Sequence, residues 1–301
     1  MTDAPETRPA LVRASLLAVQ VLFGINYLVS KDIVSVLPPA AWAVLRSSAA
    51  FAIVAVIALA GRRRLPPRRD VFILAIAAQF GVVLNQGLFL EGLARTTVGH
   101  SALLCAQIPT FVLVFSVLAR QETLTLRKGL GLIAGLAGVA VLLQADRFRF
   151  DSATLAGDLL TLANAASFAV YLVLSRRLMA RNDPLAATAV VFFFGALGML
   201  AWGGRSLGGI DPAAFDAGLW TAMAYAVVGA TVATYFLNMW AVKRVVATRL
   251  ALYIFLQPVI AAALGVALRG EAVTPRFVTA TALVFTALLL RDGGPTLRRA
   301  K

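Results

Sequence analysis

The sequence predicts an all-α integral membrane protein of ten transmembrane helices, arranged as two inverted five-helix repeats. Three observations predict this architecture: an apolar composition, apolar stretches of membrane-spanning length, and residues repeated at constant spacing in the two halves. Of the 301 residues, 60% are hydrophobic and 14% are charged, whereas a soluble domain is about 45–50% apolar and about 25% charged. This composition is typical of a chain whose outer surface is solvated by lipid.

Apolar stretches of about 20 residues, the length that a helix needs to cross the hydrocarbon layer, recur along the chain. Pairs such as Pro38-Pro39, Pro66-Pro67 and Gly203-Gly204 separate them and are typical of loops. The fifth stretch of each half is short for a full crossing. The expected helices cover residues 12–30, 40–60, 71–93, 97–119, 128–144, 157–175, 184–202, 217–238, 246–268 and 274–290.

The basic residues indicate how the chain is oriented. The net charge is +14. Lys and Arg lie in short clusters between apolar stretches, as in 62–69, and do not form a basic face that could bind nucleic acid. Loops rich in Lys and Arg stay in the cytoplasm. With a cytoplasmic N-terminus, twenty of the 28 basic residues lie on the cytoplasmic side. We therefore expect a multi-pass protein of the cell (inner) membrane with both termini in the cytoplasm.

The chain has one cysteine, Cys105, and one histidine, His100, which limits its chemistry. An intrachain disulfide is impossible, and the Cys/His set of a structural zinc site is missing. The two residues form no cluster of nucleophile, base and acid, and the sequence has no GxxxxGK[ST] phosphate loop. We expect no cofactor, no metal and no nucleotide-driven motor, and we expect that the protein is not an enzyme.

Two sets of matched residues, one spaced by 145 positions and the other by 149, indicate an internal repeat. Five helices per half is an odd number, so the second half enters the membrane from the opposite side. Inverted repeats mark secondary transporters, whose binding site lies near the midplane between the halves. The expected repeats are 12–144 and 157–290, with short cytoplasmic termini 1–11 and 291–301. The matched pairs are Phe23 with Phe168, Ser30 with Ser175, Lys31 with Arg176, Pro109 with Pro258, Glu122 with Glu271, and Thr125 with Thr274.

Several loose motifs, distributed over both halves, resemble those of one family. They are Gly24-Ile25-Asn26-Tyr27, Lys31, Arg46, Pro109 through Glu122, Gly157-Asp158-Leu159-Leu160, Ser167 to Tyr171, and Pro258 through Glu271. The chain resembles the drug/metabolite transporter superfamily, specifically its EamA-type members, over nearly its whole length. Phe23 stands where a tryptophan is common in such proteins. The resemblance implies ten helices, two EamA-like units, and efflux or exchange of small solutes.

Polar side chains within the expected helices are candidates for a solute site, because polar groups are costly in the bilayer unless they face the bundle interior or a cavity. The third helix of each half is polar at equivalent depth, since Asn85 and Gln86 match Thr234 and Tyr235. Hydrogen bonds between helices, worth about 0.6 kcal/mol a pair, are the alternative. The candidate substrate-binding residues are Asn26, Tyr27, Asn85, Gln86, Gln107, Asn164, Tyr171, Tyr235, Asn238 and Gln257.

Arg46 and Glu91 are the charged candidates, at similar depth near the outer ends of the second and third expected helices. A lone charge within the bilayer costs about 2.5–3.5 kcal/mol on insertion scales, so a pairing of the two is one hypothesis. The functional interpretation is a proton-coupling carboxylate or a substrate anchor. A structural pair, or a Glu91 that reaches water, is the alternative, and the sequence leaves both open.

Pro109 and Pro258 lie near the middle of their helices, where each leaves a backbone carbonyl without its helical donor. The resulting bend is either a fixed kink or a gate. Glu122 and Glu271 lie at helix ends on opposite membrane faces. We expect these glutamates to organise tight turns, with a role in gating as the alternative.

Three local features complete the expectations. Thr125 and Thr274 are typical helix N-caps, and Asp158 is expected in the first turn of the sixth helix, where a carboxylate suits the helix dipole. Gly131 and Gly135 give the fifth helix a smooth face. That face is either a seam within the chain or the contact of a homodimer.

The sequence therefore predicts a secondary transporter, an exporter or exchanger that works by alternating access between two inverted repeats. The expected substrate is a small metabolite, such as an amino acid or an amphiphilic drug-like solute, and an ion or solute gradient is the expected energy source. An intramembrane enzyme or a non-transporting membrane receptor or scaffold is the alternative. The expected partners are the small-molecule substrate and the lipid bilayer, with no nucleic acid, and a homodimer is left open.

Overall fold

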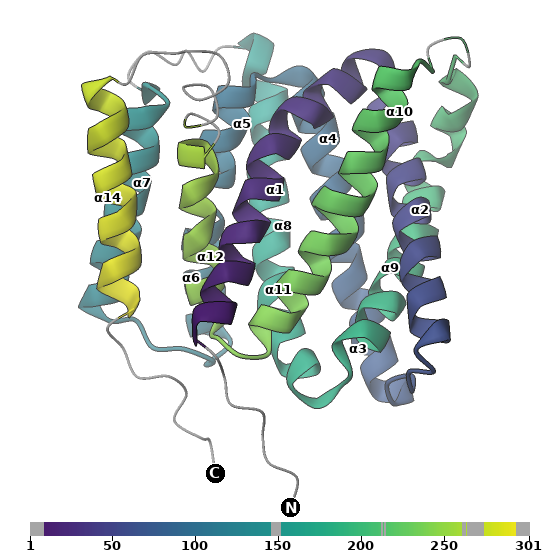
Figure 1. Ribbon diagram of the computed structural model, residues 1–301, viewed down its shortest axis with the longest axis horizontal. Helices are drawn as coiled ribbons and strands as arrows, with labels where there is room; N and C mark the ends of the chain where they lie inside the picture. Colours follow the sequence, from purple (N-terminus) through teal and green to yellow (C-terminus); the bar gives the residue numbers. More distant parts are fainter. Residues whose placement is uncertain are drawn as a thin grey trace, which may run out of the picture.

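The structure is a computed structural model that describes residues 9–145, 152–211, 213, 215–260, 263 and 274–292. Within these ranges the regular secondary structure is helical, and no strand occurs. The helices stand side by side and nearly upright, with the start of α1 (Pro9–Val36) and the end of α14 (Pro275–Asp292) at the same, lower edge (Figure 1). The described part of the chain thus has the expected all-α architecture.

The first half is a series of long helices, two of which are interrupted. The expected helix at 71–93 is α3, the π-helical segment η1 and α4 in direct succession, and the one at 97–119 is α5 and α6, separated by a turn. After α1, the segments are α2 (Pro39–Ala60), α3 (Arg68–Ala78), η1 (Gln79–Leu84), α4 (Asn85–Arg95), α5 (Val98–Cys105), α6 (Ile108–Leu118) and α7 (Leu126–Leu142).

The second half shows the same kinds of interruption. The expected helix at 217–238 is α10, the π-helical segment η5 and α11, and the helix near 246 begins as α12 and the 3-10 turn η6. Before α14, the segments are α8 (Ser152–Arg181), α9 (Pro184–Gly203), η3 (Gly204–Gly209), α10 (Ala217–Ala224), η5 (Tyr225–Ala233), α11 (Thr234–Val242), α12 (Ala247–Leu252) and η6 (Tyr253–Phe255).

The interruptions of the two halves are related by the 149-residue spacing of Pro109 and Pro258. Adding 149 to the range of η1 gives 228–233, which lies within η5. The turn between α5 and α6 comes just before Pro109, and η6 ends three residues before Pro258. Because proline lacks the helical N–H and clashes with the preceding turn, a local break accompanies each of the two prolines.

Seven helices are long and apolar enough to cross a membrane, and two shorter apolar helices, Ala247–Ile260 and Pro275–Leu290, lie among the described residues. The protein is therefore a multi-pass membrane protein. Most of these helices are longer than the apolar stretches expected from the sequence, whereas Val98–Leu118 lies within its expected stretch, 97–119. The seven long helices cover Ala10–Val36, Pro39–Ala60, Arg68–Arg95, Val98–Leu118, Thr154–Arg181, Pro184–Gly209 and Ala217–Val242.

The outer surface of the bundle is apolar, and several polar side chains are buried. Large apolar side chains face outward, and Leu59, Leu126 and Leu289 each expose more than 70% of their surface. Amides lie inside, and Gln20 and Asn164 are buried. Lipid tails solvate apolar side chains but offer no hydrogen bonds, so the amides lie inside, among the apolar side chains of the core.

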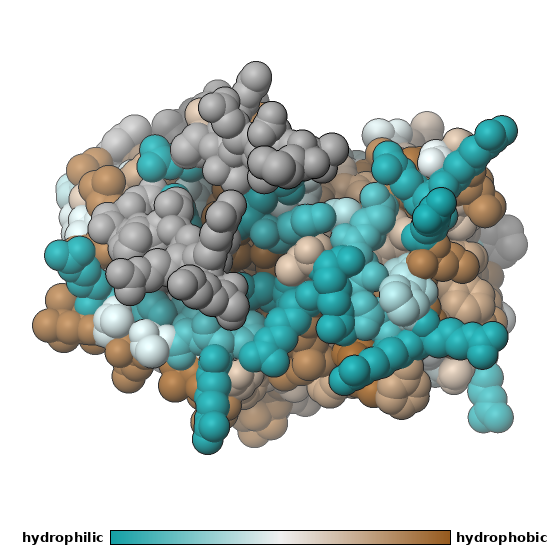
Figure 2. Space-filling model, turned by 90° about the horizontal axis from the view of Figure 1, so that it is seen from below, coloured by the Kyte–Doolittle hydropathy of each residue, from teal (hydrophilic) through white to brown (hydrophobic). Residues whose placement is uncertain are grey.

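The lower face of the bundle carries hydrophilic side chains, which gather across its middle, while hydrophobic side chains lie around its margin (Figure 2). The connection between α2 and α3 lies at this edge in Figure 1, and its Arg62, Arg63 and Arg64 are exposed. The starts of α1 and α3 and the ends of α2 and α14 lie at the same edge. The strongly basic connection between α2 and α3 therefore lies on the same face as the start of α1 and the end of α14.

The glycines of α7 form a seam within the chain. A Cβ at Gly131 would lie 3.2 Å from the Ala287 carbonyl oxygen of α14, and one at Gly138 would lie 2.9 Å from that of Ala280. A side chain at either position would push the two helices apart. The glycine face of α7 therefore packs against α14 within the chain, which is the first of the two alternatives expected from the sequence. The expected caps at Thr125 and Thr274 are also present, since their hydroxyls accept hydrogen bonds from the amides of Lys128 and Phe277.

Candidate functional site

A cavity lies in the interior of the bundle, between elements of both halves. Its walls come from α1, α2, α4, α5, α6, α8, η5, α11, α12 and η6. Eight of the ten candidate substrate-binding residues line this central cavity: Asn26, Tyr27, Asn85, Gln86, Asn164, Tyr235, Asn238 and Gln257. Substrate contact by these residues stays a prediction, but the side chains do converge on one space.

Two candidates, Gln107 and Tyr171, lie outside the cavity lining. Gln107 is in the turn between α5 and α6, where its side-chain oxygen accepts a 3.4 Å hydrogen bond from Thr110. Tyr171 is buried, and its hydroxyl donates to the Met239 sulfur at 3.3 Å. Its ring fills the space beside Gly81, where any Cβ would overlap it. Polarity alone did not distinguish a side chain on the cavity wall from one packed just behind it.

Gln20 is a cavity residue that the sequence analysis missed. It is fully buried in α1, and its side-chain oxygen accepts a 2.8 Å hydrogen bond from Gln257. This bond joins the two halves across the cavity. A single glutamine in an otherwise apolar stretch was the available signal, because an amide within lipid has to face inward. Phe23, Phe89 and Phe168 were also not singled out as cavity residues, and they add apolar wall to the cavity.

The cavity amides differ in how well they are paired. Asn164 donates a 2.5 Å hydrogen bond to the Asn85 carbonyl and accepts from the Cys105 thiol at 3.6 Å. In contrast, the side-chain oxygens of Asn26 and Asn238 are buried and have no hydrogen-bond partner among the described residues. Buried acceptors of this kind are costly unless they bind water or a ligand. Asn26 and Asn238 therefore present acceptors that a polar solute can use.

Arg46 and Glu91 do not pair. The Arg46 guanidinium is buried on the cavity wall, where Nε donates to the Thr231 hydroxyl at 2.6 Å and Nη2 to the Ala230 carbonyl at 3.3 Å. Glu91 instead forms an ion pair with Arg95, one turn along α4. The paired interpretation was wrong because similar depth does not fix direction: Arg46 faces the interior of the bundle, and Glu91 faces its own helix neighbour.

The π-helical segments are held by side chains of the opposite half. The Phe80 and Gly81 carbonyls of η1 accept hydrogen bonds from the Ser167 hydroxyl, at 2.8 Å, and from the Tyr235 hydroxyl. In η5, the Ala230 carbonyl accepts from Arg46. Each half thus supplies donors to the irregular backbone of the other.

Sequence comparison identifies the family. The model of the EamA-like transporter family matches residues 13–144 and, a second time, residues 155–291. The chain belongs to this family. It is accordingly an EamA-type member of the drug/metabolite transporter superfamily.

The relatives of this EamA-type protein are also named as transporters. The uncharacterized transporter YvbV of Bacillus subtilis (strain 168) is 29% identical over 222 residues, which cover 74% of this chain and 69% of YvbV. An uncharacterized transporter of Archaeoglobus fulgidus is 25% identical over 280 residues, covering 91% and 96%. A solved crystal structure has the same fold, with a TM-score of 0.75 over 93% of this chain and 98% of that chain at 23% identity. The protein is thus a membrane transporter.

At the lower end of the EamA bundle, buried acids of the first half contact the second half. The Glu122 carboxylate accepts a 2.8 Å hydrogen bond from the Thr248 hydroxyl at the start of α12 and an ion pair from Lys128 at 2.8 Å. Burial raises the pKa of Glu122, but the bonds from Lys128 and Thr248 outweigh it and hold the pKa below its usual value. Asp70 similarly pairs with Arg181 at the end of α8. The expected role of Glu122 in organising its turn is compatible with these contacts, whereas Glu271 lies outside the described residues.

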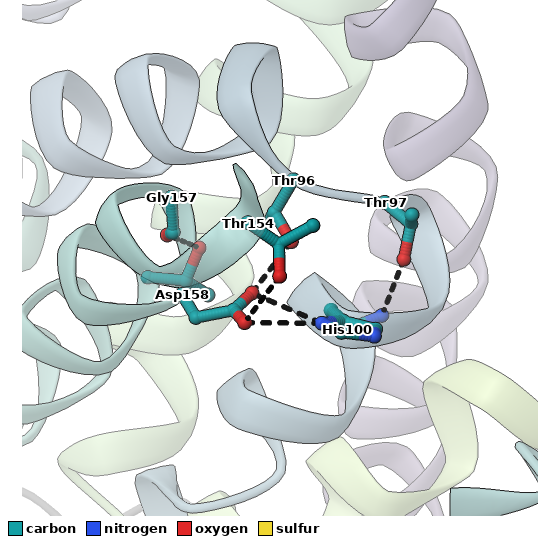
Figure 3. A network of polar contacts seen from close by, with 7 residues as sticks. Thr96, Thr97, His100, Thr154, Gly157 and Asp158 are labelled. Atoms are coloured by element: carbon teal, nitrogen blue, oxygen red, sulfur yellow. Dashed lines mark hydrogen bonds and ion pairs between the residues drawn. The ribbon is translucent and has the colours of Figure 1, made fainter. Parts of the chain in front are cut away.

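At the upper end, Asp158 of α8 points toward His100 of α5 (Figure 3). Its carboxylate lies 3.1 Å from His100 Nδ1 and accepts hydrogen bonds from Thr96, at 2.5 Å, and Thr154, at 3.2 Å. Asp158 was expected in the first turn of its helix, but α8 begins six residues earlier, at Ser152. The acid therefore joins the two halves instead of capping its own helix.

Proposed function

We propose that this EamA-type protein is a secondary transporter that binds a small amphiphilic solute in the central cavity and moves it by alternating access. The observation that carries the proposal is the pair of unpartnered acceptors, Asn26 of α1 and Asn238 of α11, which face one cavity from opposite halves. A midplane site between two halves is the arrangement that alternating access requires.

We further propose that the chain crosses the membrane ten times, in two inverted five-helix repeats. The seven long helices, together with α7, α14 and the helix that α12 begins, make up this number. The 149-residue relation of η1 to η5 supports the repeat. The start of α1 and the end of α14 on one face (Figure 1) agree with an even number of crossings.

We propose that the protein lies in the cell (inner) membrane. Its lower face in Figure 1 then faces the cytoplasm. The arginines between α2 and α3 lie on that face, and basic loops remain cytoplasmic. A cysteine-accessibility map on a Cys105→Ser background tests this orientation. The thiol introduced by Arg63→Cys is expected to react with a membrane-impermeant maleimide only after the cells are opened.

The mechanism that we propose uses the two ends of the cavity in alternation. Contacts of Glu122 with Thr248 close the lower end, and contacts of Asp158 with His100 close the upper end. Opening one end breaks one set while the other set remains. The breaks that precede Pro109 and Pro258 supply bends at which helices can tilt, because irregular backbone is tolerated where it lines a cavity.

An ion or solute gradient supplies the energy in this proposal, with export or exchange as the physiological mode. Glu91 is the candidate for proton coupling, because its carboxylate is only partly buried, at 19% exposure, beside Arg95. Glu91→Gln in proteoliposome uptake over a range of pH tests the assignment. An unchanged pH profile would remove Glu91 from the coupling role.

The decisive experiment is a flux screen with purified protein in proteoliposomes, preloaded with metabolites and amphiphilic solutes. We expect saturable exchange of at least one solute, lowered about fivefold or more by Asn238→Ala, since a lost buried hydrogen bond is worth about 1–3 kcal/mol. Gln107→Ala is the matched control, because this amide lies outside the cavity. A protein that exchanges nothing, or that converts a lipid in detergent, would contradict the proposal and favour a receptor or an enzyme, respectively.

A further inference from the structure

The central cavity has one charged wall. Among its described lining residues Arg46 is the single charged side chain, and it exposes 3% of its surface. The other polar groups of the wall are amides and hydroxyls, for example Asn26, Asn238 and Tyr235. A cationic solute would therefore meet a like charge and no carboxylate.

The Arg46 guanidinium is held in a fixed position but is not saturated. Nε donates to the Thr231 hydroxyl and Nη2 to the Ala230 carbonyl, and Thr231 in turn donates to the Ala226 carbonyl at 2.7 Å. A guanidinium has five N–H donors, so these two bonds leave three. Within the described ranges Arg46 has no ion pair, and Glu91 pairs with Arg95 instead.

A buried cation without a counter-charge is costly, and in membrane proteins such residues mark sites for ligands or ions. The planar guanidinium fork matches a carboxylate, which it binds through two parallel hydrogen bonds. The neutral partners of Arg46 orient this fork without neutralising it. The charge is therefore available to a ligand that enters the cavity.

The rest of the wall indicates what the carboxylate is attached to. Phe23, Phe89 and Phe168 contribute aromatic surface to the same cavity, and aromatic and apolar walls bind the body of a solute while a few polar groups orient it. We infer that the substrate is an amphiphilic monocarboxylate, whose anionic group binds Arg46 and whose apolar or aromatic body lies against these rings. This inference rests on the proposed function, because it takes the cavity as the solute site.

The competing role for Arg46 is structural: it ties α2 to η5 and does nothing else. The two roles differ in ligand discrimination. A structural arginine affects every ligand alike, whereas a carboxylate anchor distinguishes a carboxylate from its uncharged amide of the same shape.

The test measures binding in detergent by ligand-dependent thermal stabilisation, with two matched pairs of probes: 3-phenylpropanoate against 3-phenylpropanamide, and 4-methylpentanoate against 4-methylpentanamide. We expect wild-type protein to bind each carboxylate about tenfold or more tightly than its amide. Arg46→Gln should bring the ratio to about one, and the surface control Arg205→Gln, at an exposed arginine, should leave it unchanged. Arg46→Lys keeps the charge but loses the fork, so its ratio should lie between the two, and it decides the matter if Arg46→Gln does not fold.

The inference is overturned if wild-type protein binds neither carboxylate, binds carboxylates and amides alike, or keeps its carboxylate preference in Arg46→Gln. Flux measurements with the same probes separate this inference from the proposed function. Equal exchange of carboxylates and amides would refute the carboxylate anchor and leave a transporter. An Arg46-dependent carboxylate preference in binding, without any flux in proteoliposomes, would keep the anchor and refute transport.

Discussion

The Tyr235 hydroxyl, in the second half of the chain, donates a hydrogen bond to the Gly81 carbonyl in the π-helical segment of the first half. The Tyr235 ring also packs on Phe192, with centroids 4.7 Å apart, and on Tyr171, at 5.9 Å. Tyr235 thus lines the cavity, packs in the buried core and bonds the irregular backbone of η1.

Tyr235→Phe is expected to lower the free energy of unfolding by about 1–2 kcal/mol, because the Gly81 carbonyl loses its donor in a buried place. Tyr171→Phe is the matched control, since its hydroxyl donates to the weak sulfur acceptor of Met239, and it should cost less than about 0.5 kcal/mol. Thermal unfolding of both variants in one detergent compares them. Equal losses of unfolding free energy in the two variants would show that the hydrogen bond to the Gly81 carbonyl does not stabilise the fold.

Gly81→Ala tests the packing of η1 against α8. An added Cβ would overlap the Tyr171 ring, and overpacking of a core typically costs about 1–3 kcal/mol. Gly129→Ala is the control, because nothing lies within 4 Å of the Cβ that it would add in α7. Alanine loses less backbone entropy than glycine when the helix folds, so this variant should be more stable than wild type by about 0.5–1 kcal/mol. The two alanines are therefore expected to change the melting temperature in opposite directions.

The sequence was sufficient where a single rule decides the outcome. Apolar length located the helices, and the cost of an amide in lipid placed Asn26, Asn164 and Asn238 inside. It was not sufficient where the partner is remote. Arg46 binds Thr231, 185 positions away, and no local pattern distinguishes Thr231 from Glu91 as that partner. The π-helical segments were also not predicted, because their carbonyls depend on donors from the other half.

Two acids near the upper end of the bundle should differ in their importance for stability. The buried Asp158 carboxylate contacts His100, Thr96 and Thr154, so Asp158→Ala removes three polar contacts at once. We expect a loss of about 2–4 kcal/mol. Glu91→Ala removes only an i,i+4 pair with a half-exposed arginine, worth about 0.3–0.5 kcal/mol. Unfolding measured side by side would contradict this ranking if both losses were similar.

Glu122 should make the stability of the protein depend on pH. Its pKa in the folded state lies below the ordinary value of a glutamate, because the bonds from Lys128 and Thr248 outweigh the desolvation that raises it. A depressed carboxylate pKa stabilises the folded state above the unfolded pKa, and this contribution is lost as pH falls through the folded pKa. The melting temperature of wild-type protein should therefore decrease when the pH is lowered from 6 to below about 4.

Glu122→Gln should have a lower melting temperature than wild type at pH 6 and a smaller decrease on acidification, because a neutral amide has no proton to gain. Thr248→Val is the matched variant on the opposite side of the contact: it removes the 2.8 Å hydrogen bond from the Thr248 hydroxyl to Glu122 but leaves the carboxylate and Lys128 in place, so part of the pH dependence should remain. If Glu122→Gln showed the full wild-type decrease, the pH dependence would have to come from a different carboxylate. The contact between α12 and the turn after α6 would then owe its stability to packing and not to this charge.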